Sequence, residues 1–214
     1  MAIEGEITSA NTAPRERGVD HAFRDILRRE PDAEGRRLYE QQQRGGTSLS
    51  VIRRELIGST EFQEELERRE REGGRSSAVE EAYRRILGRD IDDEGRRAYV
   101  EGDKTLRVIV DNLVDSDEFR DRQREVIRGE VAGLYEEILE RGGDEEGVGH
   151  YATEVESGRS LVDIRREMER SEEYQEKLST RDEARRRGEH TRGRFRELRE
   201  QGGQRSRRSV KKTC

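Results

Sequence analysis

The apolar residues of this chain recur at helical spacing in three segments. Side chains at i, i+3, i+4, i+7 and i+8 line one face of a helix, and this spacing begins at Val19, Val79 and Val131. The strict alternation of apolar and polar residues that is typical of strands does not occur in these segments. The pattern therefore predicts an all-α fold.

Each segment continues with signals for further helices. An aspartate followed three residues later by glycine opens a second helix, a serine or threonine opens a third, and a serine three residues before an aromatic residue opens a fourth. Oxygen atoms of such side chains accept hydrogen bonds from the free amides of a first helical turn. The glycine costs helix propensity, and we expect it to allow the close approach of a neighbouring helix. The predicted helix caps are Asp32, Asp92, Asp144, Ser59, Ser116 and Ser171.

These blocks occur three times in the same order, which indicates three tandem helical repeats of about four helices each. The middle copy is three residues shorter between Tyr99 and Leu106, which is typical of a surface loop. We expect connectors around Gly73–Ser77 and Arg128–Gly129. The predicted divisions are a polar N-terminal extension at 1–18, repeats at 19–72, 79–127 and 131–180, and a C-terminal tail at 181–214.

The composition indicates how the copies must pack. Apolar residues form only 29% of the chain and charged residues 44%, and one copy of some fifty residues buries too little apolar surface to be stable alone. We therefore expect the three repeats to shield one another in one array. The side chains predicted for its core are Phe23, Ile26, Leu27, Tyr39, Phe62, Tyr83, Ile86, Leu87, Tyr99, Phe119, Tyr135, Ile138, Leu139, Tyr151 and Tyr174.

Charge is unevenly divided along the chain, whose net charge is -6. The segment 185–214 has twelve Lys or Arg against three Glu, which is +9, so the remainder carries about -15. We interpret this segment as a basic helical or disordered tail, and nucleic-acid binding through it is one hypothesis. Its basic residues are Arg185, Arg186, Arg187, Arg192, Arg194, Arg196, Arg199, Arg205, Arg207, Arg208, Lys211 and Lys212.

The sequence holds no combination of residues that indicates an active site. Its histidines, His21, His150 and His190, fall at non-equivalent positions. The single cysteine, Cys214, leaves no second thiol for a zinc site. We therefore expect a protein that is not an enzyme, with no catalytic residue and no cofactor.

One weak candidate for a calcium loop occurs in the second copy, where acidic residues alternate before a glycine. N-capping by the aspartate explains the corresponding residues of all three copies, whereas calcium binding explains one. The calcium candidates are Asp90, Asp92, Glu94 and Glu101.

The first eighteen residues lack the apolar centre of a signal peptide, and no segment has the length and hydropathy of a membrane span. We expect a cytoplasmic protein without membrane insertion. The alternatives are a virion component or a surface-associated protein that leaves the cell by non-classical export.

Two motifs of the second copy carry a resemblance to a known family. Tyr83 to Gly95 read Tyr-x-x-Ile-Leu-Gly-Arg-Asp-x-Asp-x-Glu-Gly, and Ser116 to Phe119 read Ser-Asp-Glu-Phe. This pattern resembles the bacterial domain-of-unknown-function family 4214, in three copies over about 19–178, and is distantly similar to phycobilisome rod linkers. The resemblance implies an all-helical fold without an assigned catalytic residue. It also implies association with large surface proteins, some glycosyltransferases and phage structural proteins.

These observations favour a non-enzymatic structural or adaptor protein that binds protein, or glycan, within a larger assembly such as a cell surface or phage particle. The expected partners are other proteins or further copies of the chain, and the expected contacts are the exposed face of each second helix and the loops after Tyr39, Tyr99 and Tyr151. One alternative is a nucleic-acid-associated or packaging protein that acts through the basic tail. Another is an accessory module of a glycosyltransferase system.

Overall fold

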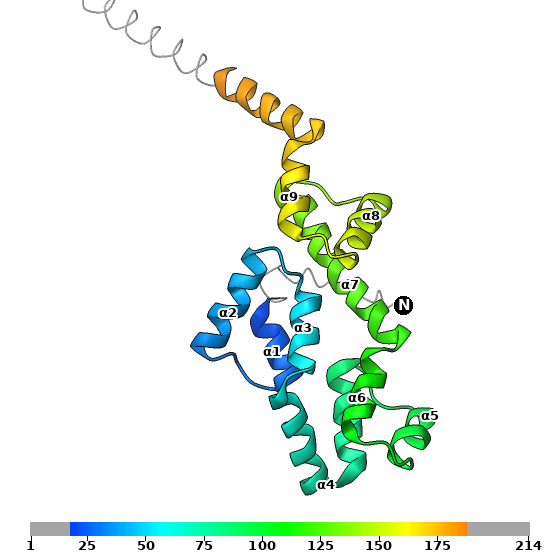
Figure 1. Cartoon of the computed structure of the whole chain (residues 1–214). Coiled ribbons are helices and arrows are strands. Elements are labelled where there is room, and N and C mark those ends of the chain that lie inside the picture. The colour runs from blue at the N-terminus through cyan, green and yellow to red at the C-terminus, as the bar shows by residue number, and fades with distance from the viewer. Residues whose placement is uncertain (1–17, 188–214) are drawn as a thin grey trace, which may run out of the picture. The chain divides into compact units, whose positions relative to one another are not determined.

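The computed structural model describes residues 18–187, and each regular element in that range is a helix (Figure 1). No strand occurs between residues 18 and 187, so the all-α prediction is confirmed. In chain order the elements are α1 (Val19–Leu27), α2 (Ala33–Arg44), α3 (Leu49–Ile57), α4 (Thr60–Ile86), α5 (Asp93–Gly95), the π-helix η2 (Arg96–Val100), α6 (Leu106–Val114), α7 (Asp117–Leu134), the π-helix η3 (Tyr135–Leu139), α8 (Glu145–Glu156) and α9 (Leu161–Arg170), followed by a helical segment at 172–187.

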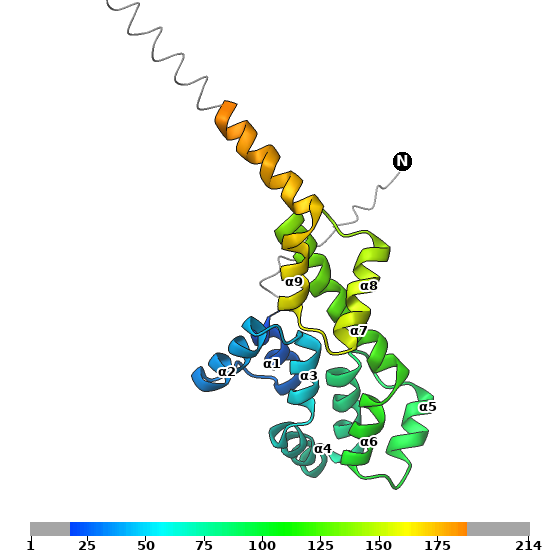
Figure 2. The same ribbon diagram turned by 45° about the horizontal axis from the view of Figure 1, so that its top comes forward.

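The chain divides into two compact units, residues 1–165 and 166–214. The first unit contains α1 to α8 and the first half of α9, and the second contains the rest of α9 and the helical segment 172–187 (Figure 2). The division falls inside the segment 131–180 that we predicted as the third repeat. Most side chains of 172–187 are exposed, so this segment adds little buried surface.

The six expected cap residues accept hydrogen bonds from amides of the helices that follow them. A side-chain oxygen here satisfies a first-turn amide that has no partner within its helix. The Oδ1 atoms of the three aspartates each lie 2.7 Å from the amide nitrogen of the glycine three residues later. The hydroxyls of Ser59, Ser116 and Ser171 lie 3.2, 3.2 and 3.3 Å from the amide nitrogens of Phe62, Phe119 and Tyr174.

Helix α4 contains a break at Gly74, which has φ 80° and ψ 168°. The two halves run in different directions from this point (Figure 1). Arg85 in the second half therefore reaches Glu65 in the first, with 3.4 Å between Nη2 and Oε1. The predicted connector at Gly73–Ser77 is this break, because glycine adopts a positive φ without steric cost.

The predicted connector at Arg128–Gly129 is wrong. Helix α7 runs without interruption from Asp117 to Leu134, and η3 continues it to Leu139. Ile127 and Val131, one turn apart on either side of Gly129, are 4% and 0% exposed. Their burial holds the helix together across a glycine that would weaken it in isolation.

Ten of the expected core side chains are buried, and the other five lie closer to the surface than expected. The second helix of each predicted copy places one tyrosine ring against an aromatic ring of the first helix. Tyr39, for example, meets Phe23 with 5.5 Å between ring centroids. The corresponding rings in the other two copies are 6.3 Å apart. The five half-buried residues are Tyr39, Tyr99, Leu139, Tyr151 and Tyr174.

Glu130 joins α7 to the start of α3. Its Oε1 accepts a hydrogen bond from the Leu49 amide at 2.8 Å, and its Oε2 accepts one from the Ser48 hydroxyl at 2.5 Å. In the same loop, the Gly46 carbonyl accepts a hydrogen bond from the Leu161 amide at 3.0 Å. The turn that precedes α3 is therefore held by segments that lie far along the chain, in addition to its neighbours in sequence.

Replacing Glu130 with glutamine is expected to change how stability depends on pH. Burial raises the pKa of the Glu130 carboxyl, against the hydrogen bonds from Ser48 and Leu49 that lower it. The pKa of the Glu130 carboxyl is therefore higher in the folded chain than in the unfolded chain, where it is about 4.3. The carboxyl contributes its full stabilisation below the unfolded-chain pKa, and this contribution is lost as pH rises through the folded-chain pKa. The stability of the unaltered protein relative to Glu130→Gln should therefore fall with rising pH and then level off.

Urea unfolding from about pH 4 to about pH 8 measures this difference. Glu125→Gln, at an exposed position of the same helix, is the matched control. An unaltered protein that becomes more stable relative to Glu130→Gln as pH rises would contradict the prediction.

Candidate binding groove between helices α3 and α6

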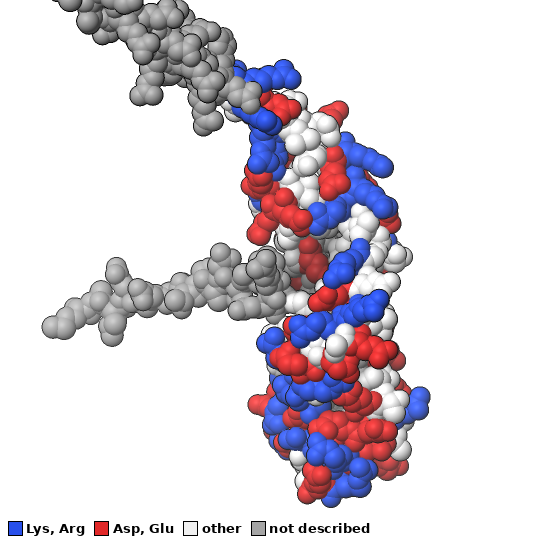
Figure 3. Space-filling view, turned by 90° about the vertical axis from the view of Figure 1, so that its left-hand side faces the viewer, with Lys and Arg blue, Asp and Glu red and all other residues white. Residues whose placement is uncertain are grey.

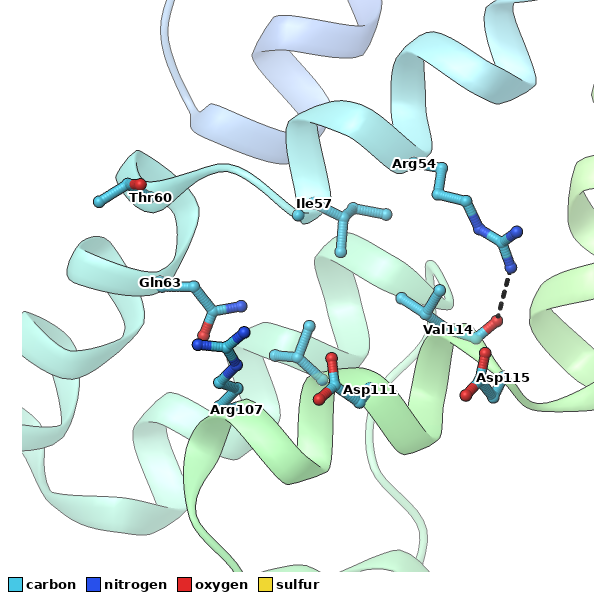
Figure 4. A pocket seen from close by; sticks show the side chains of 10 residues that line it. Arg54, Ile57, Thr60, Gln63, Arg107, Asp111, Val114 and Asp115 are labelled. Atoms are coloured by element: carbon cyan, nitrogen blue, oxygen red, sulfur yellow. Dashed lines mark hydrogen bonds between the residues drawn. The ribbon is translucent and has the colours of Figure 1, made fainter.

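A groove of about 590 Å³ lies between the end of α3, the start of α4 and α6 (Figure 4). Its volume falls in the range of ligand pockets. It combines an apolar floor with a charged rim. The residues that line it are Arg54, Ile57, Gly58, Thr60, Gln63, Arg107, Val110, Asp111, Val114 and Asp115.

The floor is built by the ends of two helices. Ile57 is the last residue of α3 and is 1% exposed, whereas Val110 in α6 is 2% exposed. Val114 is half-buried and lies one helical turn after Val110, so the two valines face the same side of α6. The groove therefore offers a short apolar strip with the spacing of a helix.

The rim carries charges of both signs on exposed side chains. Arg54 donates a long hydrogen bond of 3.5 Å to the Val114 carbonyl, and its guanidinium lies 5.9 Å from the centroid of the Phe119 ring. In the part of the chain that the structure describes, none of the four charged side chains of the rim forms a salt bridge. These side chains are Arg54, Arg107, Asp111 and Asp115.

Many arginines elsewhere in the first unit are paired with carboxylates. Arg89 contacts both carboxylate oxygens of Glu118, at 2.5 and 2.8 Å, and Arg29 contacts Glu61 in the same way. On the face drawn in Figure 3, basic and acidic side chains are interspersed, without a large patch of one sign. Within residues 18–187, the four charges of the rim are thus free of the ionic pairing that these arginines show, as are some other exposed side chains such as Glu64 and Arg71.

A buried ion pair fixes the packing of α1 against α4. Arg85 is 2% exposed, and it donates hydrogen bonds to Glu81 at 2.7 Å and to the Ile26 carbonyl at 3.3 Å. Arg28 adds a 3.1 Å bond to Glu81. Burial opposes ionisation of Glu81, but the arginines outweigh it and hold the pKa of this carboxyl below its ordinary value. This pair is structural and lies among residues that do not line the groove.

Arginine stacks on an aromatic ring at three corresponding places. Arg29, Arg89 and Arg141 lie 5.4, 5.3 and 5.2 Å from the ring centroids of Phe23, Tyr83 and Tyr135. Each also donates to the carbonyl of the next residue at 3.0 Å. Sequence reasoning missed this contact, although an arginine three residues before each capping aspartate was the available signal.

The structure does not gather the calcium candidates into a site. Asp90 pairs with Arg84 at 2.6 Å. Asp92 uses one oxygen to cap its helix and the other to contact Arg89 at 3.1 Å. Between residues 18 and 187 there is no group of three or more His, Cys, Asp or Glu placed to hold a metal ion.

The other predicted sites lie away from the groove or outside the described residues. No residue of the second helices lines the groove, although α2 has no buried residue and exposes Leu38 to 52%. Of the basic tail, Arg185, Arg186 and Arg187 lie on the exposed helical segment. Outside the described residues lie the N-terminal extension up to residue 17 and Arg192, Arg194, Arg196, Arg199, Arg205, Arg207, Arg208, Lys211 and Lys212.

Comparison with known proteins identifies one stretch of the chain. Residues 110–178 match the family described as Domain of unknown function (DUF4214). The match covers one copy, from within α6 to the helical segment after α9, and it includes the α6 valines of the groove floor. No curated protein and no solved structure matches the chain. Among the described helices, none is long and apolar enough to cross a membrane.

Proposed function

We propose that the chain is a non-enzymatic structural or adaptor protein that binds another protein within a larger assembly. The groove between α3 and α6 is the observation that carries the proposal. It joins an apolar floor to four charged side chains that lack an ionic partner among the described residues. Protein interfaces have this anatomy, with an apolar centre and a polar rim.

We further propose that the chain contains three copies of one helical unit, of which the family match covers one. The same contacts support this at three places: an aspartate cap on a glycine amide, a ring pair between the first two helices, and an arginine on the first ring. The groove lies where the third helix of the first proposed copy meets the third helix of the second. Helical repeat proteins bind partners on extended surfaces that neighbouring copies build together.

Reversing the charges of the groove is expected to abolish the binding of a protein partner. The triple variant Arg107→Glu, Asp111→Arg and Asp115→Arg alters exposed side chains without changing the apolar floor. Like charges placed against a complementary surface disfavour association strongly. Chemical crosslinking in cells that contain the chain naturally, followed by quantitative mass spectrometry, should show roughly a tenfold or greater loss of at least one partner.

The control is a variant with reversed charges outside the groove, Glu125→Arg with Glu101→Arg. Both positions are exposed, and both variants should retain the circular dichroism of the unaltered protein. If the groove variant and the control retain the same crosslinked proteins, the groove is not the binding site and the proposal fails.

A further inference from the structure

The charges of the groove follow one face of α6. Arg107, Asp111 and Asp115 are spaced four residues apart, from the first turn of α6 to the residue after its end, so they lie in a row along the helix. In order, the row reads basic, acidic, acidic. Val108, three residues before Asp111, is 42% exposed and is one of the few large apolar side chains that the first unit exposes.

The opposite wall contributes few competing charges. Arg54 lies at the end of the groove near Val114 and Asp115, and in Figure 4 Gln63 and Arg107 lie toward the other end. Thr60 and Gln63, from the start of α4, are uncharged. The α6 row therefore dominates the electrostatic pattern that a partner would meet.

We propose that the groove receives an amphipathic helix of the partner protein, an inference that rests on the function proposed above. The occupant has apolar side chains one turn apart, against Ile57, Val110 and Val114. It carries one acidic and two basic residues at four-residue spacing, against Arg107, Asp111 and Asp115. A helix satisfies its own backbone hydrogen bonds, so it needs only side-chain contacts from a groove with helical walls. An extended strand would need an open sheet edge, and residues 18–187 contain no sheet.

Designed peptides test this directly on the unaltered full chain. The probe is a helix-stabilised peptide of about twenty residues with leucines one turn apart and the charge row Glu, Lys, Lys at four-residue spacing, made in both chain directions. The comparison peptide has the same leucines and the opposite row, Lys, Glu, Glu. Fluorescence anisotropy should show that the first peptide, in one direction, binds roughly ten times more tightly than the second.

The triple charge-reversed variant should invert this preference, because its row reads acidic, basic, basic. Equal binding of the two peptides, or binding by neither, overturns the helix proposal. Preference for one peptide that is unchanged in the triple variant overturns it as well, because the contact would then lie elsewhere.

The two proposals fail in different ways. One outcome is that the peptides bind equally or not at all while the triple variant loses its crosslinked partner in cells. In that case the groove binds protein, but the occupant is not an amphipathic helix with this charge row. If the triple variant keeps all its crosslinked partners, the proposed function fails whatever the peptides do.

Discussion

Arg85→Ala should lower the free energy of unfolding by about 3 kcal/mol, at the lower end of the cost of breaking a buried ion pair. The Arg85 side chain is 1% exposed and links three parts of the fold, with bonds to Glu81, to Glu65 and to the Ile26 carbonyl. Alanine leaves a cavity and removes the hydrogen bond from the guanidinium to the Ile26 carbonyl, which joins α4 to α1. Glu81 keeps Arg28 as a neighbour at 3.1 Å, which limits the loss.

Arg84→Ala is the matched control, since it removes the same side chain one position earlier in the same helix. Arg84 is 42% exposed at its side chain, and its closest ionic contact is with the exposed Asp90. Exposed ion pairs contribute little to stability because water already solvates both charges. Urea unfolding followed by circular dichroism compares the two variants, and equal stabilities would contradict the role assigned to Arg85.

Gly147→Ala should destabilise the protein by about 1–3 kcal/mol through overpacking, despite the better helix propensity of alanine. A methyl group on Gly147 would lie 2.3 Å from the Tyr135 hydroxyl oxygen and 3.3 Å from the ring carbon that carries it. From the sequence we expected this glycine to allow the close approach of a neighbouring helix. In the structure, the absence of a side chain on Gly147 leaves space for the Tyr135 hydroxyl. Thermal or urea unfolding measures the effect.

The first copy provides the internal control. At Gly35 the corresponding ring belongs to Phe23, which has no hydroxyl, and a methyl group would lie 3.6 Å from it and 3.2 Å from Asp32 Oδ1. Gly35→Ala should therefore be close to neutral. Removing the hydroxyl with Tyr135→Phe should recover most of the stability lost in Gly147→Ala. Destabilisation of equal size at Gly35 and Gly147, or no recovery in the double variant, would show that the hydroxyl is not the cause.

The sequence by itself determined the local structure, because helical periodicity and capping depend on residues within four positions of one another. The apolar spacing from Val19 predicted α1, and Asp32 predicted the start of α2. The break of α4 near Gly74 could also be placed from the glycine pair. These features need no knowledge of what each helix packs against.

The tertiary structure decided which helices run on without a break and which side chains are covered. Gly129 suggested a boundary, but the burial of Ile127 and Val131 carries α7 through it. The tyrosines of the second helices fitted a core by hydropathy, yet Tyr39 is half-buried because α2 lies at the edge. Whether a side chain is covered depends on partners distant in sequence, which periodicity does not reveal.

The groove is likewise a feature that the sequence alone does not reveal. The four-residue spacing of Arg107, Asp111 and Asp115 is visible in the sequence, and it predicts a charged helix face. Only the fold brings Ile57 of α3 beside Val110 and thereby turns that face into the rim of a groove. Local chemistry determined which helices form, whereas the packing of helices far apart in the chain determined where a partner can bind.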